Sequence, residues 1–326
     1  MGRINSKIAL SAIVVAVLLA APTISPTQDN YPNRPVKLVF PYAAGSLGDV
    51  LARLVGEKLT ISLGQPVIVE NRPGASGNLG AEAIARAEPD GYTLLFTPPP
   101  PLAINQSLFP KLGFDPDAFV PLTIVAAVPN VLVVHPRVSA ANVEDLIAFA
   151  RAQPNKLSYA STGSGGTPHL TAEMLKARMG IQIVHVPYKG VPPALTDLIS
   201  GQVDMMFANL GDALQHIKSG KLKALAIGSR TRFQGLPNLP AMSEVLPDFV
   251  SDTWFAVAAP PKTPSAVAIR LSAAIADTLK LPDVGKRLQD FSATPVGSSP
   301  VETAALIKQE SQRWRQVITS ASIKPD

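Results

Sequence analysis

The fold is decided by one stretch of the chain, Val36-Lys-Leu-Val-Phe40-Pro-Tyr-Ala-Ala-Gly45-Ser-Leu-Gly-Asp49. Its opening run from Val36 to Phe40 is short and almost entirely apolar, which predicts a buried strand. A loop of small residues follows. The segment from Asp49 to Leu63 then predicts a helix, since its apolar residues recur at helical spacing (Leu51, Leu54, Val55 and Leu59). A strand, a loop and a helix in this order form the repeating unit of α/β proteins.

The same pattern continues along the chain. We expect further strands at residues 67–70, 93–97, 131–134, 158–160, 183–186, 203–207 and 222–227. We expect further helices at residues 77–87, 143–152, 167–179, 192–200 and 213–219. Strands and helices that alternate through short links predict an α/β fold whose sheet is parallel and carries helices on both faces.

The length of 326 residues favours two domains. Two apolar strands that end at proline mark the expected crossings, one before His135-Pro136 and one from Trp254 to Ala259. A chain that leaves one domain at the first strand and returns at the second gives discontinuous domains, residues 31–130 plus 255–326 and residues 131–254. Two such connections make a hinge, and a hinge between α/β domains encloses a ligand cleft.

Composition excludes several classes of protein. Apolar residues make up 46% of the chain and charged residues 16%, which argues against a disordered protein. The absence of cysteine removes disulfides, thiol nucleophiles and cysteine-based metal sites. The net charge of +5 is a small excess without a basic run interleaved with aromatic residues, so we expect no nucleic-acid partner.

The N-terminus has the layout of a secretory signal peptide. Arg3 and Lys7 precede an uncharged apolar run, and small residues at Leu19-Ala20-Ala21 offer a cleavage site. We therefore expect residues 1–21 to be removed near Ala21 and the protein to be exported to the periplasm. An uncleaved N-terminal anchor is the alternative.

The first candidate binding segment is the loop that joins the first strand to its helix. Such a loop lies at the carboxyl edge of the sheet, where ligands bind, and a helix start favours an anion. Asp49 is expected as the N-cap of the helix or as a group that holds a water or a ligand amine. The alternative is an ordinary turn with a capping aspartate. The candidate residues here are Tyr42, Ala44, Gly45, Ser46, Leu47 and Asp49.

The second candidate segment also follows a strand and opens a helix. Its hydroxyls and glycines suit a carboxylate or phosphate cradle, although it matches neither a P-loop nor the nucleophile elbow of hydrolases. His169, one turn inside the helix, is expected to be a structural histidine. The candidate residues are Ser161, Thr162, Ser164, Gly165, Gly166 and Thr167.

Three further strand ends complete the expected cavity. Thr97 precedes the stiff run Pro98 to Pro101, and Phe207 and Asn209 end another strand, where they are expected to wall the pocket and bond the ligand. Lys189, after His185-Val-Pro-Tyr, either meets an anion or is an ordinary exposed lysine.

Catalytic and metal chemistry are not indicated. The four histidines show no metal-ligand spacing, and no carboxylate pair or Ser/His/Asp set can be nominated. We therefore predict a monomeric binding protein without a cofactor, and not an enzyme. An enzyme acting through Ser164 or His169 is the minor alternative.

Taken together, these segments resemble one family, the Bug receptors of tripartite tricarboxylate transporters. The matching stretches cover nearly the whole chain beyond the signal peptide: Tyr31-Pro-x-Arg34-Pro-Val36, Pro41-Tyr-x-x-Gly45-x-x-x-Asp49-x-x-Ala52-Arg53, Leu63 to Gly77, Ala87-x-Pro89-Asp-Gly-Tyr-Thr-Leu-Leu95, Gly165-Gly-Thr-Pro-His169, His185-Val-Pro-Tyr-Lys-Gly190, Gly220 to Ala226 and Trp254-Phe255. In this order and spacing the motifs are specific.

The resemblance implies a type II periplasmic binding protein of the flytrap kind. Two α/β domains would close over a small organic acid, whose carboxylate is held by the loops Tyr42 to Asp49 and Ser161 to Thr167. The implied partners are the integral membrane components of a transporter, which an orphan receptor lacks. A sensor domain that presents the ligand to a membrane signalling protein shares every pocket feature and stays open as an alternative.

The first loop departs from the family pattern. Gly45-Ser46 stands where the family usually has two glycines, and Leu47-Gly48 stands where it often has Pro/Ser-Thr. Leu47 is expected to bring an apolar contact to the ligand. An aromatic or apolar-bodied acid is therefore favoured over citrate, although the sequence does not name the acid.

Overall fold

The structure is a computed structural model that describes residues 31–325. The expected signal peptide lies outside the described residues. Within residues 31–325, no helix is long and apolar enough to cross a membrane.

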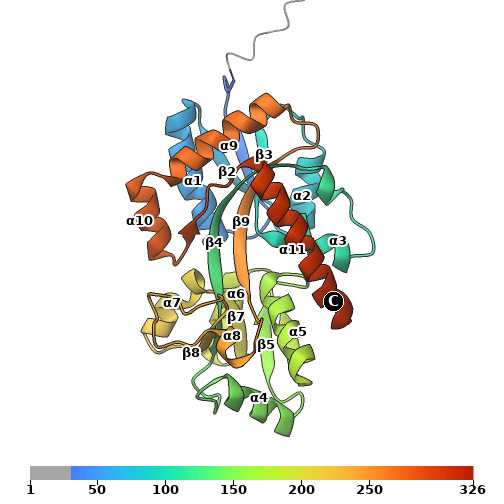
Figure 1. Cartoon of the computed structure of the whole chain (residues 1–326), viewed down its shortest axis with the longest axis vertical. Helices are drawn as coiled ribbons and strands as arrows, with labels where there is room; N and C mark the ends of the chain where they lie inside the picture. Colours follow the sequence, from blue (N-terminus) through green and yellow to red (C-terminus); the bar gives the residue numbers. More distant parts are fainter. Residues whose placement is uncertain (1–30, 326) are drawn as a thin grey trace, which may run out of the picture.

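The chain builds an upper part of the molecule first, at the top of Figure 1. This part begins with the predicted unit, strand β1 (Val36–Phe40) and helix α1 (Leu47–Leu63). It continues with β2 (Val67–Asn71), η2 (Ala75–Gly77), α2 (Asn78–Ala85), β3 (Thr93–Thr97), η3 (Pro100–Ile104), α3 (Asn105–Leu108) and η4 (Pro116–Ala118). Strand β4 (Val120–Val134) then runs down the molecule into the lower part (Figure 1).

The lower part alternates strands and helices as the sequence predicts. It contains α4 (Val143–Ala152), β5 (Ser158–Ser161), α5 (Thr167–Met179), β6 (Val184–Pro187), α6 (Val191–Ser200), β7 (Met205–Asn209), α7 (Leu210–Lys218), β8 (Lys223–Ile227) and α8 (Met242–Val245). Strand β9 (Asp252–Ala259) returns to the upper part beside β4.

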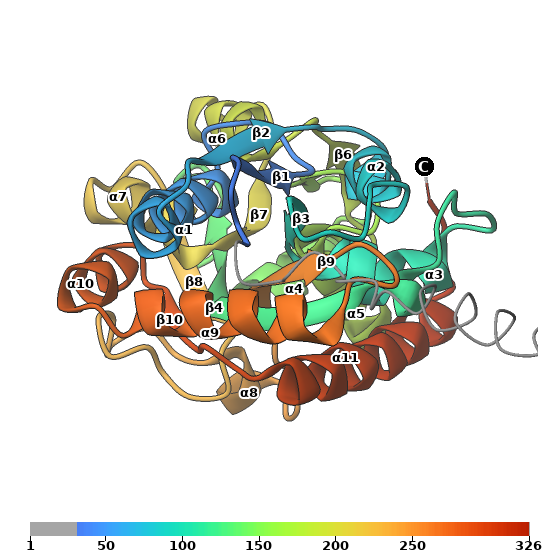
Figure 2. The ribbon, with the colours of Figure 1, turned by 90° about the horizontal axis from the view of Figure 1, so that it is seen from above.

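The last segment completes the upper part with α9 (Ser265–Leu279), α10 (Pro282–Asp290), β10 (Thr294–Pro295) and α11 (Pro300–Ser320). Seen from above, α9 and α11 lie side by side along one side of the molecule (Figure 2). Helix α11 begins with a capping box, in which the Ser299 side chain accepts from the backbone of Glu302 and the Glu302 carboxylate accepts from the backbone of Ser299.

The sheet is mixed, which corrects the expectation of a parallel sheet. Its strand order is β2-β1-β3-β9-β4-β7-β5-β6, and β8 and β10 also pair with β4. The β1, β2 and β3 strands are parallel, as are β5, β6 and β7, whereas β4 and β9 pair antiparallel to each other. The reason is that β4 carries the chain down the molecule and β9 carries it back up, so the two strands must run in opposite directions.

Pairing along β4 changes partner where the strand passes between the two parts. Residues Val120 to Pro129 pair with β9, and residues Asn130 to Val134 pair with β7. We call the upper part, with β1–β3, β9 and β10, the first half, and the lower part, with β5–β8, the second half.

Each half buries apolar residues on both faces of its sheet. In β1, Leu38 and Phe40 pack with α1 and α9, while Val39 packs on the opposite face with α2. In the lower end of β4, Leu132 packs on the face of α4 and α5, while Val131 packs on the face of α6 and α7. The predicted α/β architecture with helices on both faces is confirmed. A smaller apolar cluster joins α3, α5 and α11 across the two halves (Ile104, Leu108, Leu170, Trp314, Ile318 and Ile323).

Candidate functional site

A cavity lies where the two halves meet at their strand ends. It encloses about 580 Å³ of empty space, part of which is open to solvent. Residues of the first half line one side: Phe40, Tyr42, Ala43, Ser46, Gly48, Pro98, Pro100, Thr253 and Phe255. Residues of the second half line the other: Thr162, Gly166, Thr167, Pro168, Gly190, Val191, Met206 and Asn209.

The start of α1 forms one wall of this cavity. Ser46 is its N-cap, because the Ser46 hydroxyl accepts a hydrogen bond from the Asp49 amide at 3.5 Å. The expectation that Asp49 is the N-cap is therefore wrong. Gly48 allows a close approach here, since a Cβ at this position would lie 2.6 Å from the Phe40 ring and 2.7 Å from the Phe255 ring. The helix start can come this close to the cavity wall only with glycine at this position.

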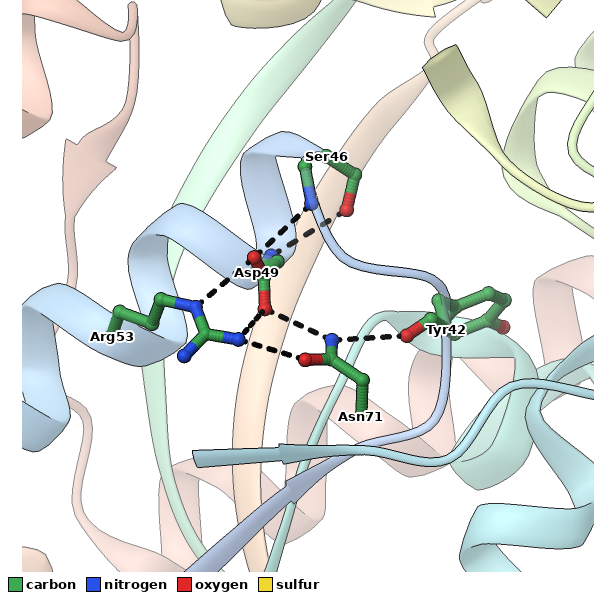
Figure 3. Close-up of polar contacts among 6 residues, drawn as sticks. Tyr42, Ser46, Asp49, Arg53 and Asn71 are labelled. Atoms are coloured by element: carbon green, nitrogen blue, oxygen red, sulfur yellow. Dashed lines mark hydrogen bonds and ion pairs between the residues drawn. The ribbon is translucent and has the colours of Figure 1, made fainter. Parts of the chain in front are cut away.

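Asp49 lies in the first turn of α1 and turns its carboxylate to its own half (Figure 3). Its oxygens accept hydrogen bonds from the Gly45 amide at 3.1 Å, from Arg53 at 3.0 and 3.2 Å, and from Asn71 Nδ2 at 2.9 Å. Burial alone would raise the pKa of Asp49, but the bonds from Arg53, Asn71 and Gly45 outweigh it and hold the pKa below its ordinary value. Asp49 thus shapes the loop and does not line the cavity.

Asn71 extends this network to the cavity wall. Its side chain donates to the carbonyl oxygen of Tyr42 at 3.1 Å and accepts from Arg53 Nη2 at 2.8 Å. The Tyr42 hydroxyl donates to the carbonyl oxygen of Ser76 at 3.1 Å, and Tyr42 itself lines the cavity. Neither Arg53 nor Asn71 is among the predicted site residues, although both lie in the quoted motifs.

The start of α5 forms the facing wall. Gly166 is the N-cap of α5, and Thr167 and Pro168 are its first residues. Pro168 suits this position because the first turn of a helix needs no amide donor there. Of the six predicted residues of this loop, Thr162, Gly166 and Thr167 line the cavity. A helix start with two hydroxyls beside it provides a favourable place for an anion.

The other three predicted residues of the loop support it from behind. The Ser161 hydroxyl lies 2.7 Å from His185 Nε2 and is fully buried. The Ser164 carbonyl accepts from the Ser76 hydroxyl, which links the two halves. Gly165 has a φ of +85°, and a Cβ there would lie 2.6 Å from Leu108 of the first half. Gly165 therefore serves the contact between the halves and does not line the cavity.

His169 has the structural role that the sequence predicts. Its Nδ1 accepts from the Gly165 amide at 3.1 Å, and its ring packs against His185 with 4.4 Å between centroids. This stack holds the glycine-rich loop in place from beneath. Lys189 is exposed and does not line the cavity.

Several other predicted residues lie away from the cavity wall. Ala44 and Gly45 are exposed in the first loop, and Leu47 packs into the core of the first half. Thr97 is fully buried, with its hydroxyl bonded to the Pro98 carbonyl at 3.0 Å. Phe207 stacks on Phe249 in the core of the second half.

Strand alternation explains the position of Phe207. Successive side chains of a strand point to opposite faces, so β7 can turn either Met206 or Phe207 to the cavity, but not both. The structure turns Met206 to the cavity, and Asn209 joins it at the end of the strand.

The cavity wall is largely apolar, and most of its apolar residues are not among the predicted site residues. The unpredicted residues are Phe40, Ala43, Gly48, Pro98, Pro100, Pro168, Gly190, Val191, Met206, Thr253 and Phe255. An apolar residue at a strand end has the same sequence signature as a core residue, because both belong to the same apolar run. Only the run Pro98 to Pro101, already noted as a stiff rim, signalled the wall.

Asp212 on α7 is a functional candidate that no sequence motif marked. Its Oδ1 accepts from the backbone amide of Leu47, the first residue of α1, at 2.8 Å across the two halves. Its Oδ2 accepts from Asn209 Nδ2 at 3.1 Å. Burial raises the pKa of Asp212 to about 6, although the bonds from Leu47 and Asn209 act in the opposite direction.

The lining determines what the cavity can bind. None of the described lining residues carries a charged side chain, and the polar groups of their side chains are hydroxyls and one amide. Within residues 31–325, no group of three or more His, Cys, Asp or Glu side chains is placed to hold a metal ion. Two helix starts and hydroxyls beside an apolar wall suit a small molecule with an anionic end and an apolar body.

Comparisons with known proteins agree with this geometry. Residues 51–323 match the family model described as the tripartite tricarboxylate transporter family receptor. The chain is 37% identical over 318 residues to the protein BugT of Bordetella pertussis, covering 97% of this chain and 98% of that protein. A solved structure of an R. palustris protein with adipate is similar with a TM-score of 0.87 at 34% identity, covering 91% of this chain and 100% of the other. MatC from Rhodopseudomonas palustris with bound malate has a TM-score of 0.83 at 32% identity, covering 88% and 100%.

Proposed function

The chain belongs to the tripartite tricarboxylate transporter receptor family, and on that premise we propose that it binds a small organic acid in the cavity between its halves. Its family and fold are those of solute-binding receptors. One observation carries the proposal: an uncharged cavity lies between the starts of α1 and α5, which belong to different halves.

The acid's carboxylate sits at the start of α5. Thr162 and Thr167, which carry hydroxyls, line the cavity there, and the helix dipole favours an anion. The start of α1 is a less favourable position for the carboxylate, because two of its amides are already used. The Leu47 amide donates to Asp212, and the Asp49 amide donates to Ser46. The apolar body of the ligand then contacts Phe40, Met206 and the other apolar lining residues.

Two hinged domains close over the ligand. We assign residues 31–130 plus 255–326 to one domain and residues 131–254 to the other, as the sequence suggests. The partner change along β4 at Pro129 and Asn130 supports this division, as do the separate apolar clusters of each half. A ligand that binds the closed arrangement better than the open one shifts the population toward closure. X-ray scattering should therefore show a smaller radius of gyration with the bound acid, and an unchanged radius would contradict hinge closure.

The receptor acts in the periplasm and delivers its ligand to the integral membrane components of a transporter. In this proposal the exported chain loses residues 1–21, works as a monomer and performs no catalysis. Mass spectrometry of the protein from a periplasmic extract should give the mass of a chain that begins just after Ala21. The mass of the full chain would contradict cleavage.

Thermal unfolding with a panel of acids tests the binding function. The panel contains adipate, malate, citrate, hexanoate and phenylacetate, with adipamide as the uncharged control. A ligand present at a hundred times its dissociation constant adds about 2.7 kcal/mol to the free energy of unfolding, which is a shift of several degrees. A shift with one or more acids and none with adipamide is expected. No shift with any acid, for protein shown by mass spectrometry to carry no bound molecule, would overturn the proposal.

A pair of threonine variants tests where the carboxylate sits. Thr167→Val removes one hydroxyl from the cavity wall and should weaken binding of the identified acid about fivefold, the equivalent of about 1 kcal/mol. Thr196→Val is the matched control, since Thr196 is exposed on α6 and bonds only the Pro192 carbonyl of its own helix. Equal affinities for the two variants would remove the start of α5 from the site.

A further inference from the structure

Asp212 lies where the two halves meet, next to Asn209 of the cavity wall. Gly211 allows this approach, since a Cβ there would lie 2.3 Å from the Phe291 carbonyl oxygen and 3.0 Å from Leu47, both in the first half. The carboxylate of Asp212 then reaches the Leu47 amide. Within residues 31–325 no lysine, arginine or histidine forms an ion pair with Asp212. The Asp212 carboxylate is therefore offset by two hydrogen bonds and by no ion pair.

Asp212 also fixes the orientation of the neighbouring Asn209 amide. A carboxylate only accepts hydrogen bonds, so the Asn209 group that faces it at 3.1 Å must be the NH₂ and not the oxygen. Asn209 Oδ1 consequently points away from Asp212. This oxygen is buried, and it has no hydrogen-bond partner among the described residues.

Asn209 lines the cavity, and its buried amide oxygen is an acceptor that no described residue uses. Buried polar groups in folded proteins are nearly always paired, and an unpaired one calls for an explanation. A ligand that donates a hydrogen bond to this oxygen would explain why the protein leaves it unpaired. A ligand carboxylate cannot donate to this oxygen, because it only accepts hydrogen bonds. It would also be repelled by the Asp212 carboxylate behind Asn209, which no ion pair offsets.

We propose that Asn209 and Asp212 together select a ligand that presents a hydroxyl or ammonium donor, instead of a second carboxylate, to this wall of the cavity. The inference rests on the proposed function and names its substrate class, a monocarboxylic acid with an apolar body and a donor group. Asn209 contacts the ligand, and Asp212 is a positioning residue that acts through Asn209 and through its charge. In this respect the chain differs from its structural neighbour with adipate, a dicarboxylate without a donor group.

The experiment compares acids of matched length that differ only at the far end. Calorimetry measures the affinities of straight-chain acids of four to eight carbons that end in CH₂OH, in CH₂NH₃⁺, in CH₃ or in a second carboxylate. At the length that binds best, we expect an acid with a donor to bind about tenfold or more tightly than the dicarboxylate, the effect of about one hydrogen bond. Equal or tighter binding of the dicarboxylate would overturn the inference and leave the proposed function intact. Binding by none of these acids would overturn both.

The variant Asp212→Asn separates a positioning role from a merely structural one. The new amide removes the charge and can donate to Asn209 Oδ1, which lets the Asn209 amide turn its NH₂ to the cavity. We expect the preference for the donor acid over the dicarboxylate to fall about tenfold. Asp277→Asn, which removes a charge from an exposed pair with Lys280, is the control and should keep the preference.

A uniform loss of affinity for all four ligand types in Asp212→Asn would indicate a structural role and overturn the inference. If the variant does not fold, the preference measured on the unaltered protein decides alone, since that comparison needs no substitution.

Discussion

Two aspartates meet the start of α1, and they differ in almost every physical respect. Asp49 belongs to the helix itself and receives four hydrogen bonds from its own half, from Gly45, Arg53 and Asn71. Asp212 comes from the second half and receives two. The pKa of Asp49 is lowered, whereas that of Asp212 is raised to about 6. The aspartate that is conspicuous in the sequence holds its own loop, whereas the inconspicuous one joins the two halves and bonds Asn209, which lines the cavity.

Removal of the Asp49 carboxylate should have the largest effect on stability. Asp49→Ala leaves the Arg53 and Asn71 side chains without their shared acceptor, so we expect a loss of about 3 kcal/mol in the free energy of unfolding by urea. Asp277→Ala is the control, since its exposed pair with Lys280 contributes less than about 0.5 kcal/mol. Equal losses in the two variants would show that the Asp49 network does not hold the loop.

A methyl group at Gly48 tests the side of α1 that faces the cavity. Gly48→Ala places a Cβ 2.6 Å from Phe40 and 2.7 Å from Phe255, so we expect a loss of about 2 kcal/mol and weaker ligand binding. Gly285→Ala in α10 is the matched control, because no atom lies within 4 Å of its added Cβ. It should be neutral or stabilising, as alanine favours a helix over glycine by up to about 1 kcal/mol. A Gly48→Ala protein as stable as Gly285→Ala would show that the helix start is not tightly packed.

Titration should distinguish Asp212 from Asp49. The pKa of Asp212 lies at about 6 in the folded protein against an ordinary value of 3.8, so the folded state holds this proton more tightly than the unfolded state. Its contribution to stability is therefore fully present below about pH 4 and is lost as the pH rises through 6. The contribution of Asp49 to stability has the opposite pH dependence. Its pKa is lowered in the folded protein, so its contribution is lost as the pH falls.

The measurement is the free energy of unfolding of Asp212→Asn relative to the unaltered protein from pH 4 to 7.5. As the pH rises from 4 to 7.5, we expect the free energy of unfolding of the variant to increase by about 2 kcal/mol relative to that of the unaltered protein. The size follows from the pKa difference, since one pKa unit corresponds to about 1.4 kcal/mol. A difference that stays constant with pH would contradict the raised pKa of Asp212.

The smallest expected effect concerns the N-cap. Ser46 Oγ accepts from the Asp49 amide over a long 3.5 Å, so Ser46→Ala should cost only about 0.5 kcal/mol. Ser299→Ala breaks the complete capping box of α11 and should cost about 1 kcal/mol. Thermal unfolding of the two variants compares them. A larger loss at Ser46 than at Ser299 would show that the Ser46 hydroxyl does more than cap the helix.

Much of the site could be predicted at the level of segments. Both loops that open a helix after a strand reach the cavity, and six of the predicted residues line it: Tyr42, Ser46, Thr162, Gly166, Thr167 and Asn209. Sequence position told which loops lie at the carboxyl edge, but not which side chains of a loop face inward. Ser161 and Thr97 carry hydroxyls at strand ends, yet both are buried and bonded within the protein.

The α/β elements could be predicted without the structure, because strand and helix periodicity are local properties of the chain. So could the family, since the motifs recur in a fixed order. Three features depend on how distant segments pack: the antiparallel pairing of β4 with β9, the position of Met206 and not Phe207 at the cavity, and the contact of Asp212 with Leu47. Asp212 and Leu47 are 165 residues apart, and their contact depends on how the two halves pack. Local sequence patterns do not predict such contacts, because the residues near Asp212 in the sequence carry no information about the segment that packs against it.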